Sequence, residues 1–193
     1  MHVFWRKGYI AASLTDLTEA MGISRPSLYA AFGNKEQLFR QALDRFFDGP
    51  SSYLRDALEE PTARAVAERL MGGVIDVATA SCNPPGCFWV QGSLTCGDPG
   101  DPLPQEMAKR RSAAEANIRR RFKRAVTEGD LPRDADPAAL ARFVMSVNMG
   151  MSVQAATGAT RRELLRVVET AMRAWPDSAS PRSARSSSKS KTP

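Results

Sequence analysis

SLTDLTEAMGISRPSLYAAF, residues 13–32, contains the signals for two short helices joined by a tight turn. Ser13 is positioned to cap the first helix, and Asp16, three residues later, completes a capping box. Gly22 follows the last apolar residue of that helix, where a left-handed C-terminal cap favours glycine. Ser24 is positioned to cap the second helix. This spacing predicts a helix-turn-helix.

The first turn of the second helix carries side chains suited to DNA. In a helix-turn-helix this helix lies in the major groove and presents its N-terminal residues to the bases. Arg25 can donate to guanine, Pro26 can contact a thymine methyl group, and hydroxyl groups suit phosphates. Lys35 adds a positive charge at the start of a third helix, whose free N–H groups favour an anion. On spacing alone, a tight helical corner without DNA binding is the alternative.

The rest of the chain also predicts helices. Apolar stripes at helical spacing run through residues 62–80, 105–128, 137–156 and 160–175, and strand-type alternation is absent. We therefore predict an all-α chain with a helix-turn-helix three-helix module followed by a larger helical ligand-binding and dimerisation domain. The predicted ranges are 1–48 for the first domain, 52–175 for the second and 176–193 for a disordered tail rich in Ser, Pro, Arg and Lys.

Composition and charge exclude several classes of protein. The 193 residues are 42% apolar and 25% charged, which is typical of a globular domain and not of a fibrous or disordered chain. The chain shows neither an apolar run long enough to span a membrane nor a signal peptide, so we expect a cytoplasmic protein with no membrane partner. The net charge of +6 indicates little about DNA, because residues 176–193 hold four basic residues and one acidic residue. Residues 1–49 hold six basic and five acidic residues.

Residues for catalysis or metal binding are sparse. His2 is the single histidine, and no nucleophile–histidine pair, phosphate-binding glycine loop or metal-ligand spacing is present. We expect no enzyme activity, no metal and no cofactor. Cys82, Cys87 and Cys96 are expected to be reduced thiols. A redox or electrophile sensor built on Cys87 and Cys96 is an alternative to buried cysteines that serve as small apolar residues.

The N-terminal sequence resembles the tetracycline-repressor (TetR) family. The shared residues are Lys7-Gly8-Tyr9, Ser13-Leu14-Thr15-Asp16-Leu17, Gly22-Ile23-Ser24-Arg25-Pro26-Ser27-Leu28-Tyr29, Phe32-Gly33-Asn34-Lys35-Glu36 and Leu38-Phe39. The resemblance implies a homodimeric transcription regulator, a repressor that binds double-stranded operator DNA and is released by a small-molecule effector.

The resemblance also implies roles for residues of the first domain. It implies base contacts for Arg25, Pro26 and Tyr29, and contacts to the groove edge or to phosphates for Thr15, Ser27 and Lys35. The residues that it places in the core of this domain are Leu17, Met21, Ile23, Leu28, Phe32 and Leu38.

The second domain is expected to hold the dimer interface and the effector pocket. By resemblance, the helices at 137–156 and 160–175 form a four-helix bundle with the partner's copies, although part of each stripe must pack inside its own subunit. The expected interface residues are Phe143, Val147, Leu164, Val168 and Met172. The expected lining of a pocket for a small apolar or aromatic effector is Val74, Cys82, Cys87, Phe88, Trp89, Leu94, Phe122 and Met149.

Two features depart from the family pattern or fall outside the motif. Only seven residues precede Gly8, with Phe4 on the core face, so the first half of the first helix is expected to be missing. Either the true start of the gene lies further upstream, or the protein is clipped. For a clipped protein we expect weaker DNA binding or a less stable DNA-binding module, and an interaction module with impaired DNA binding is the alternative. Basic residues also cluster at 109–111 and 119–124 of one predicted helix. We interpret this cluster as a solvated face, with accessory DNA contact as the alternative.

Overall fold

The computed structural model describes residues 1–94 and 102–176, and every regular element within these ranges is a helix. The all-α prediction is therefore confirmed for the described part of the chain. Cys96, the side chain of Leu94 and the predicted tail beyond Pro176 lie outside what the structure describes. The elements are α1 (His2–Ala11), α2 (Leu14–Met21), α3 (Arg25–Phe32), α4 (Lys35–Asp48), α5 (Tyr53–Asp56), η1 (Ala57–Glu59), α6 (Ala63–Thr79), α7 (Phe88–Leu94), α8 (Pro102–Glu128), α9 (Pro137–Ala156) and α10 (Arg161–Arg173).

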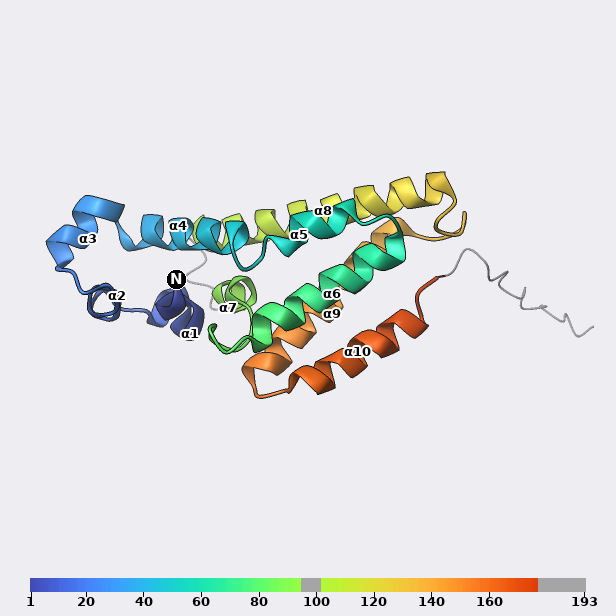
Figure 1. Ribbon diagram of the computed structural model, residues 1–193. Helices are drawn as coiled ribbons and strands as arrows, with labels where there is room; N and C mark the ends of the chain where they lie inside the picture. The colour runs from blue at the N-terminus through green and yellow to red at the C-terminus, as the bar shows by residue number, and fades with distance from the viewer. Residues whose placement is uncertain (95–101, 177–193) are drawn as a thin grey trace, which may run out of the picture.

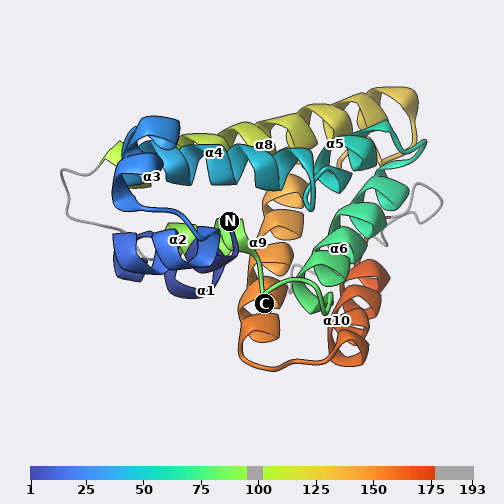
Figure 2. The same ribbon diagram turned by 60° about the vertical axis from the view of Figure 1, so that its left-hand side comes forward.

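The helices form a small head and a larger helical body. Helices α1, α2 and α3 lie together at one end of the molecule, and α4 leads from them toward the body (Figure 1). In the body, α6 packs against α9 and α10, and α8 packs against α9. Helix α7 packs against α1, so the head is attached to the body through α7 as well as through α4 (Figure 1). In the turned view, α4 lies beside α8 (Figure 2).

The signals read from the sequence begin and end the helices of the head. The Ser13 side chain accepts from the Asp16 backbone N–H while the Asp16 side chain accepts from Ser13, which is the predicted capping box. Gly22 ends α2 with φ 65°, a left-handed conformation that favours glycine. Ser24 caps α3 by accepting from the Ser27 backbone N–H, and Asn34 caps α4. The helix-turn-helix therefore follows from local chemistry.

A cluster of aromatic rings joins the head to the body. Phe88 of α7 is fully buried, with ring centroids 6.2 Å from Trp5, 5.5 Å from Phe39 and 5.6 Å from Phe46. Phe4 was predicted to face the core and is also fully buried, 5.1 Å from Phe39. Such ring pairs stabilise the fold by more than the burial of their apolar area alone. The orientation of the head on the body thus depends on side chains of α1, α4 and α7.

Candidate nucleic-acid interface

Helix α3 has one fully buried anchor and a broad exposed face. Leu28 has no exposed surface, whereas Tyr29 is 47% exposed. Arg25, Pro26 and Ser27 are also exposed. A short helix with a single apolar anchor and its N-terminal side chains in solvent can enter the major groove, which admits one α-helix.

Two of the predicted DNA-binding residues lie in contact. The Arg25 guanidinium donates from Nη2 to Thr15 Oγ1 of α2 at 2.8 Å. This hydrogen bond reduces the conformational freedom of a long side chain at the exposed start of α3. Because a guanidinium carries five N–H donors, others remain for a base edge or a phosphate.

Ser27 and Lys35 make contacts within the head. The Ser27 hydroxyl lies 2.9 Å from the Ser24 hydroxyl. Lys35 Nζ donates to the Ile10 backbone oxygen at 3.2 Å and lies 4.6 Å from the centroid of the Tyr9 ring. Burial lowers the pKa of Lys35. Lys35 therefore braces α1 against the start of α4, and its phosphate contact stays a prediction.

Asp16 ties α1 to α2 through its two oxygens. Oδ1 accepts from Lys7 Nζ at 2.6 Å, and Oδ2 accepts from the Ser13 backbone N–H at 2.9 Å and the Ser13 hydroxyl at 2.8 Å. The hydrogen bond from Lys7 and those from Ser13 lower the pKa of Asp16 to about 2. Both helices are thereby fixed on the side of the head that carries Thr15.

Asp16→Asn is expected to lower the urea midpoint of unfolding at neutral pH, because the charged form makes the stronger hydrogen bonds. The folded-state pKa of about 2 lies below the ordinary value of 3.8 for an aspartate, so this stabilisation is present above about pH 4 and is lost as pH falls toward 2. The measurement is the midpoint difference from wild type across this range. Glu19→Gln, which removes an exposed carboxyl from the same helix, is the control. A difference that does not shrink with acid would contradict this role of Asp16.

The predicted core of the head is partly different in the structure. Leu17, Leu28 and Leu38 are buried as predicted, and Ile23 and Phe32 are partly buried against the core. Met21 is 37% exposed, so its assignment to the core was wrong. Thr18 takes the inward position at the end of α2, and its hydroxyl donates to the Leu14 backbone oxygen at 2.9 Å. Sequence reasoning missed Trp5, which is fully buried.

The predicted effector residues lie in different surroundings in the structure. Phe88 and Trp89 pack on rings of the head, with Trp89 5.3 Å from Phe47, and Phe122 packs 5.4 Å from Trp175. Cys82 is exposed. Val74 and Cys87 are buried, and Met149 borders a surface hollow between α8 and α9. Their role in effector binding stays a prediction.

The cysteines give little support to the sensor alternative. Cys87 is buried, and burial raises the pKa of its thiol, which reduces the thiolate that reacts with oxidants. Its predicted partner, Cys96, lies outside the described residues.

The predicted dimer residues face two directions. Phe143 is 38% exposed on α9, and Val147 and Val168 are partly exposed. Leu164 and Met172 point into the protomer's own core, with at most 5% of their surface exposed. Leu164 and Met172 therefore have too little exposed surface to contact a partner subunit. Leu165, which is exposed beside Leu164, has enough.

The interpretation of the basic cluster of α8 as a solvated face was wrong for Arg121 and incomplete for Arg110. Arg121 is buried and donates from Nη2 to the backbone oxygens of Glu60 at 2.7 Å and Pro61 at 3.1 Å. Arg110 forms ion pairs with Asp44 and Glu106. The remaining members of the cluster are exposed or partly exposed: Lys109, Arg111, Arg119, Arg120, Lys123 and Arg124.

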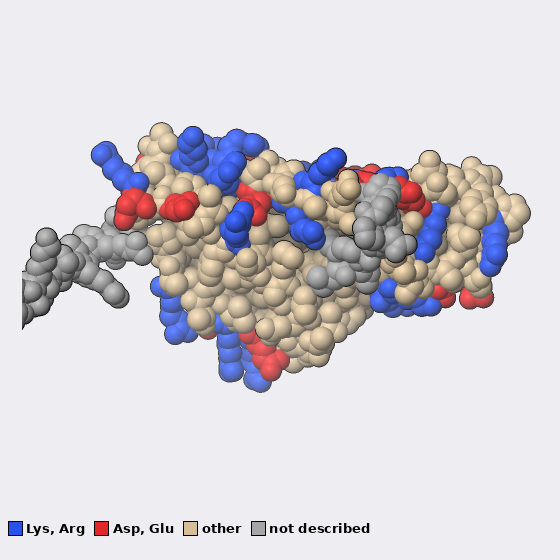
Figure 3. All heavy atoms as spheres, turned by 180° about the vertical axis from the view of Figure 1, so that it is seen from behind, with Lys and Arg blue, Asp and Glu red and all other residues tan. Residues whose placement is uncertain are grey.

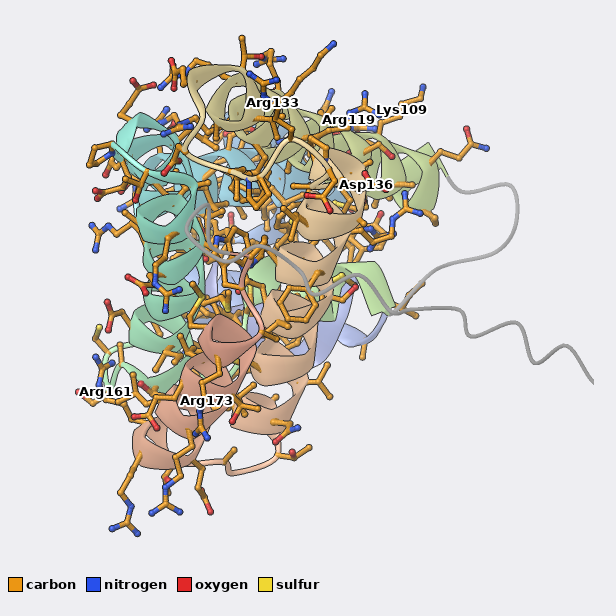
Figure 4. The ribbon with its side chains drawn as sticks, turned by 90° about the vertical axis from the view of Figure 1, so that its right-hand side faces the viewer. Lys109, Arg119, Arg133, Asp136, Arg161 and Arg173 are labelled. Carbon is orange, nitrogen blue, oxygen red and sulfur yellow. The ribbon has the colours of Figure 1, made fainter. Side chains whose placement is uncertain are left out.

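The position of the exposed basic residues at 119–124 does not favour accessory DNA contact. Arg119 points outward near Asp136 at the start of α9 (Figure 4). This part of α8 lies in the body, at the end away from α3 (Figure 1). Seen from behind, Lys and Arg side chains gather over this end of the molecule as well as over the head (Figure 3). A duplex seated on α3 would therefore lie at the other end of the molecule.

The fold and the exposed face of α3 define a helix-turn-helix DNA-binding protein with a helical second domain. Among the described residues, no three His, Cys, Asp or Glu side chains are grouped so that they could hold a metal ion. None of the helices described combines the length and apolarity needed to cross a lipid bilayer.

Comparisons with known proteins identify the family. The sequence model of bacterial regulatory proteins of the tetR family matches residues 1–42, and that of the tetracyclin repressor-like C-terminal domain matches residues 64–172. The HTH-type transcriptional repressor ComR of Escherichia coli K12 is 31% identical over 179 residues, which cover 92% of this chain and 85% of ComR. The chain belongs to the TetR family and is a DNA-binding transcriptional regulator, as predicted.

Two solved structures agree with this assignment. The TetR family regulator CifR, a cysteine mutant complexed with a 26-base-pair operator DNA, is 41% identical with a TM-score of 0.85 and covers 91% of this chain and 92% of its own. A TetR regulator from Rhodococcus sp. RHA1 is 40% identical with a TM-score of 0.59, and the match covers 92% of this chain and 95% of the Rhodococcus chain.

Proposed function

We propose that this chain is a homodimeric repressor that binds operator DNA through α3 and leaves it when a small molecule binds the helical body. The observation that carries the proposal is the exposed start of α3, with Arg25 held by Thr15 and Leu28 as its anchor. The name of ComR as a repressor and the operator complex of CifR support it. Such a protein acts on chromosomal DNA, so we place it in the cytoplasm.

The proposed test is an electrophoretic mobility shift with the region upstream of the protein's own gene. The full chain is expected to shift this duplex in the presence of excess non-specific DNA, and not a coding-region duplex of equal length. Equal binding of both duplexes would contradict operator recognition, because phosphate contacts alone bind without sequence preference.

The exposed apolar face of α9 and α10 supports the dimer. Phe143 and Leu165 are 38% and 41% exposed, and Val147 and Val168 lie partly exposed on the same two helices. Large apolar side chains that stay exposed on two neighbouring helices are candidates for an interaction site. A two-fold axis through this face would pair each helix with the partner's copy and fix the distance between the two α3 helices.

Phe143→Glu is expected to convert the dimer to a monomer, because the dimer would bury two carboxylates without partners. Sedimentation equilibrium measures the mass directly. Met21→Glu changes an equally exposed apolar residue in the head and should leave the mass unchanged. A Phe143→Glu protein that stays dimeric would place the interface elsewhere.

A hollow between α4 and the body is the proposed effector site. It has a volume of about 290 Å³, at the small end of the range for ligand pockets. We refer to it as the α4–α8 hollow. Its lining residues are Phe47, Leu54, Arg55, Leu58, Leu70, Arg110, Ala113, Ala114, Asn117, Ile118 and Met145. A ligand here would contact α4, the helix that leads to the DNA-binding head.

A further inference from the structure

The α4–α8 hollow has an apolar wall and polar lining residues that are cationic or neutral. Its apolar lining comes from α4, α5, η1, α6, α8 and α9, and includes the ring of Phe47 and the side chain of Met145. Its polar lining residues are Arg55, Arg110 and Asn117, and no Asp or Glu is among the lining residues. The guanidinium carbon of Arg110 lies 5.9 Å from the centroid of the Phe47 ring, which also lines the hollow. A ligand that matches this lining has an apolar body and an anionic end.

Arg110 belongs both to the hollow and to an ion-pair network that fastens α4. Its Nη1 lies 2.9 Å from Asp44 Oδ1 of α4, and its Nη2 lies 3.1 Å from Glu106 Oε1 on its own helix. Glu106 in turn pairs with Arg40 of α4 at 2.7 Å. Although partial burial opposes the charge, the hydrogen bonds with Asp44 and Glu106 raise the pKa of Arg110. The guanidinium is therefore charged and held at the wall of the hollow.

The carboxylate of Asp44, which binds Arg110 from α4, can be displaced by another carboxylate. The Asp44 side chain is 58% exposed, and ion pairs of such exposure contribute little to stability. Glu106 is less exposed and is shared between Arg110 and Arg40. A carboxylate that entered the hollow would therefore compete with Asp44 for Arg110 more readily than with Glu106. Its binding would release one of the two ion pairs that join α4 to α8.

We propose that the effector of this protein is an apolar monocarboxylic acid that binds in the α4–α8 hollow, replaces Asp44 on Arg110 and thereby loosens α4. This inference rests on the proposed function for its regulatory consequence, but not for the binding site itself. In the free protein Arg110 pairs with Asp44, and in the liganded protein it pairs with the carboxylate of the effector. Coupling between the effector site and the DNA-binding site requires such a difference between two states.

The first experiment compares acids with their amides. Octanoate, decanoate and phenylbutyrate, each with the matching primary amide, are titrated by calorimetry into the full chain. The acids are expected to bind at least about ten-fold more tightly than the amides, because a hydrogen bond between two charged groups is stronger than one to a neutral group. If no acid binds, or if acids and amides bind equally, the inference is overturned.

Two variants give opposite results at the same site. Arg110→Gln is expected to remove the preference for acid over amide, whereas Asp44→Asn is expected to bind the acids a few-fold more tightly, because the competing carboxylate is gone. Lys109→Gln, an exposed neighbour outside the hollow, should behave as wild type. A merely structural role of the ion pair would weaken acid binding in Asp44→Asn, which would overturn the competition.

The second experiment measures operator affinity with and without acid by fluorescence anisotropy. Acid is expected to weaken operator binding by wild type, and to do so less in Asp44→Asn, where no link to α4 remains to be broken. A protein that binds operator but ignores the acids refutes this inference and leaves the repressor intact. A protein that binds acids through Arg110 but binds no DNA specifically refutes the proposed function and leaves the site intact.

Discussion

Phe88→Ala is expected to lower the free energy of unfolding by about 3–5 kcal/mol, the usual loss for a buried Phe reduced to Ala. Phe88 has no exposed surface, and three rings from α1 and α4 surround it. The substitution leaves a cavity between rings that belong to separate helices. Because these contacts attach the head to the body, operator affinity should fall together with stability.

The measurement is urea unfolding followed by circular dichroism at a fixed protomer concentration, since a dimer's stability depends on concentration. Tyr29→Ala is the matched control, because it removes an exposed aromatic ring and should change stability by less than about 0.5 kcal/mol. Phe88→Leu should fall between the two. A loss below about 1 kcal/mol for Phe88→Ala would show that the ring cluster does not hold the head in place.

Arg25→Ala and Tyr29→Ala are expected to reduce specific operator binding strongly while leaving stability intact. Each base contact contributes about 1–3 kcal/mol of discrimination, or about 5- to 150-fold in affinity, and a dimer loses it at both half-sites. Arg25 lies at the exposed start of α3, and Tyr29 lies one turn further along the helix. Affinity for non-specific DNA should fall much less, because phosphate contacts dominate it.

Competition binding with a specific and a non-specific duplex at one salt concentration measures this discrimination. Arg173→Ala, which removes an exposed charge from the end of α10 (Figure 4), controls for the loss of positive charge. If Arg25→Ala lowers both affinities by the same factor, Arg25 contacts phosphates and not bases.

The sequence predicted the head well because its signals are local. Ser13 and Asn34 cap helices through residues three positions away, and Gly22 ends α2 through its own backbone conformation. The exposure of Arg25 and Tyr29 follows once α2 and α3 are placed. The long helices of the body were similarly visible as apolar stripes, and α9 has the predicted bounds.

The remaining features depend on contacts between distant parts of the chain. Trp5 and Phe88 meet although 83 positions separate them in the sequence, and no local period indicates this contact. The stripe on α10 contains both Leu164 and Leu165, and only packing against α6 and α9 decides that the first turns inward. The α4–α8 hollow is lined from six helical elements, so its arginines could not be grouped in advance.

The proposed repressor function depends on α3 reading the sequence of duplex DNA. Selection from a library of randomised duplexes with the full chain is the direct test, since it needs no knowledge of the operator. We predict enrichment of two inverted half-sites whose centres lie about 34–36 Å, or a multiple of this, apart. Arg25→Ala should lose the enrichment at specific base positions. Recovery of duplexes with no common sequence would contradict sequence reading by α3.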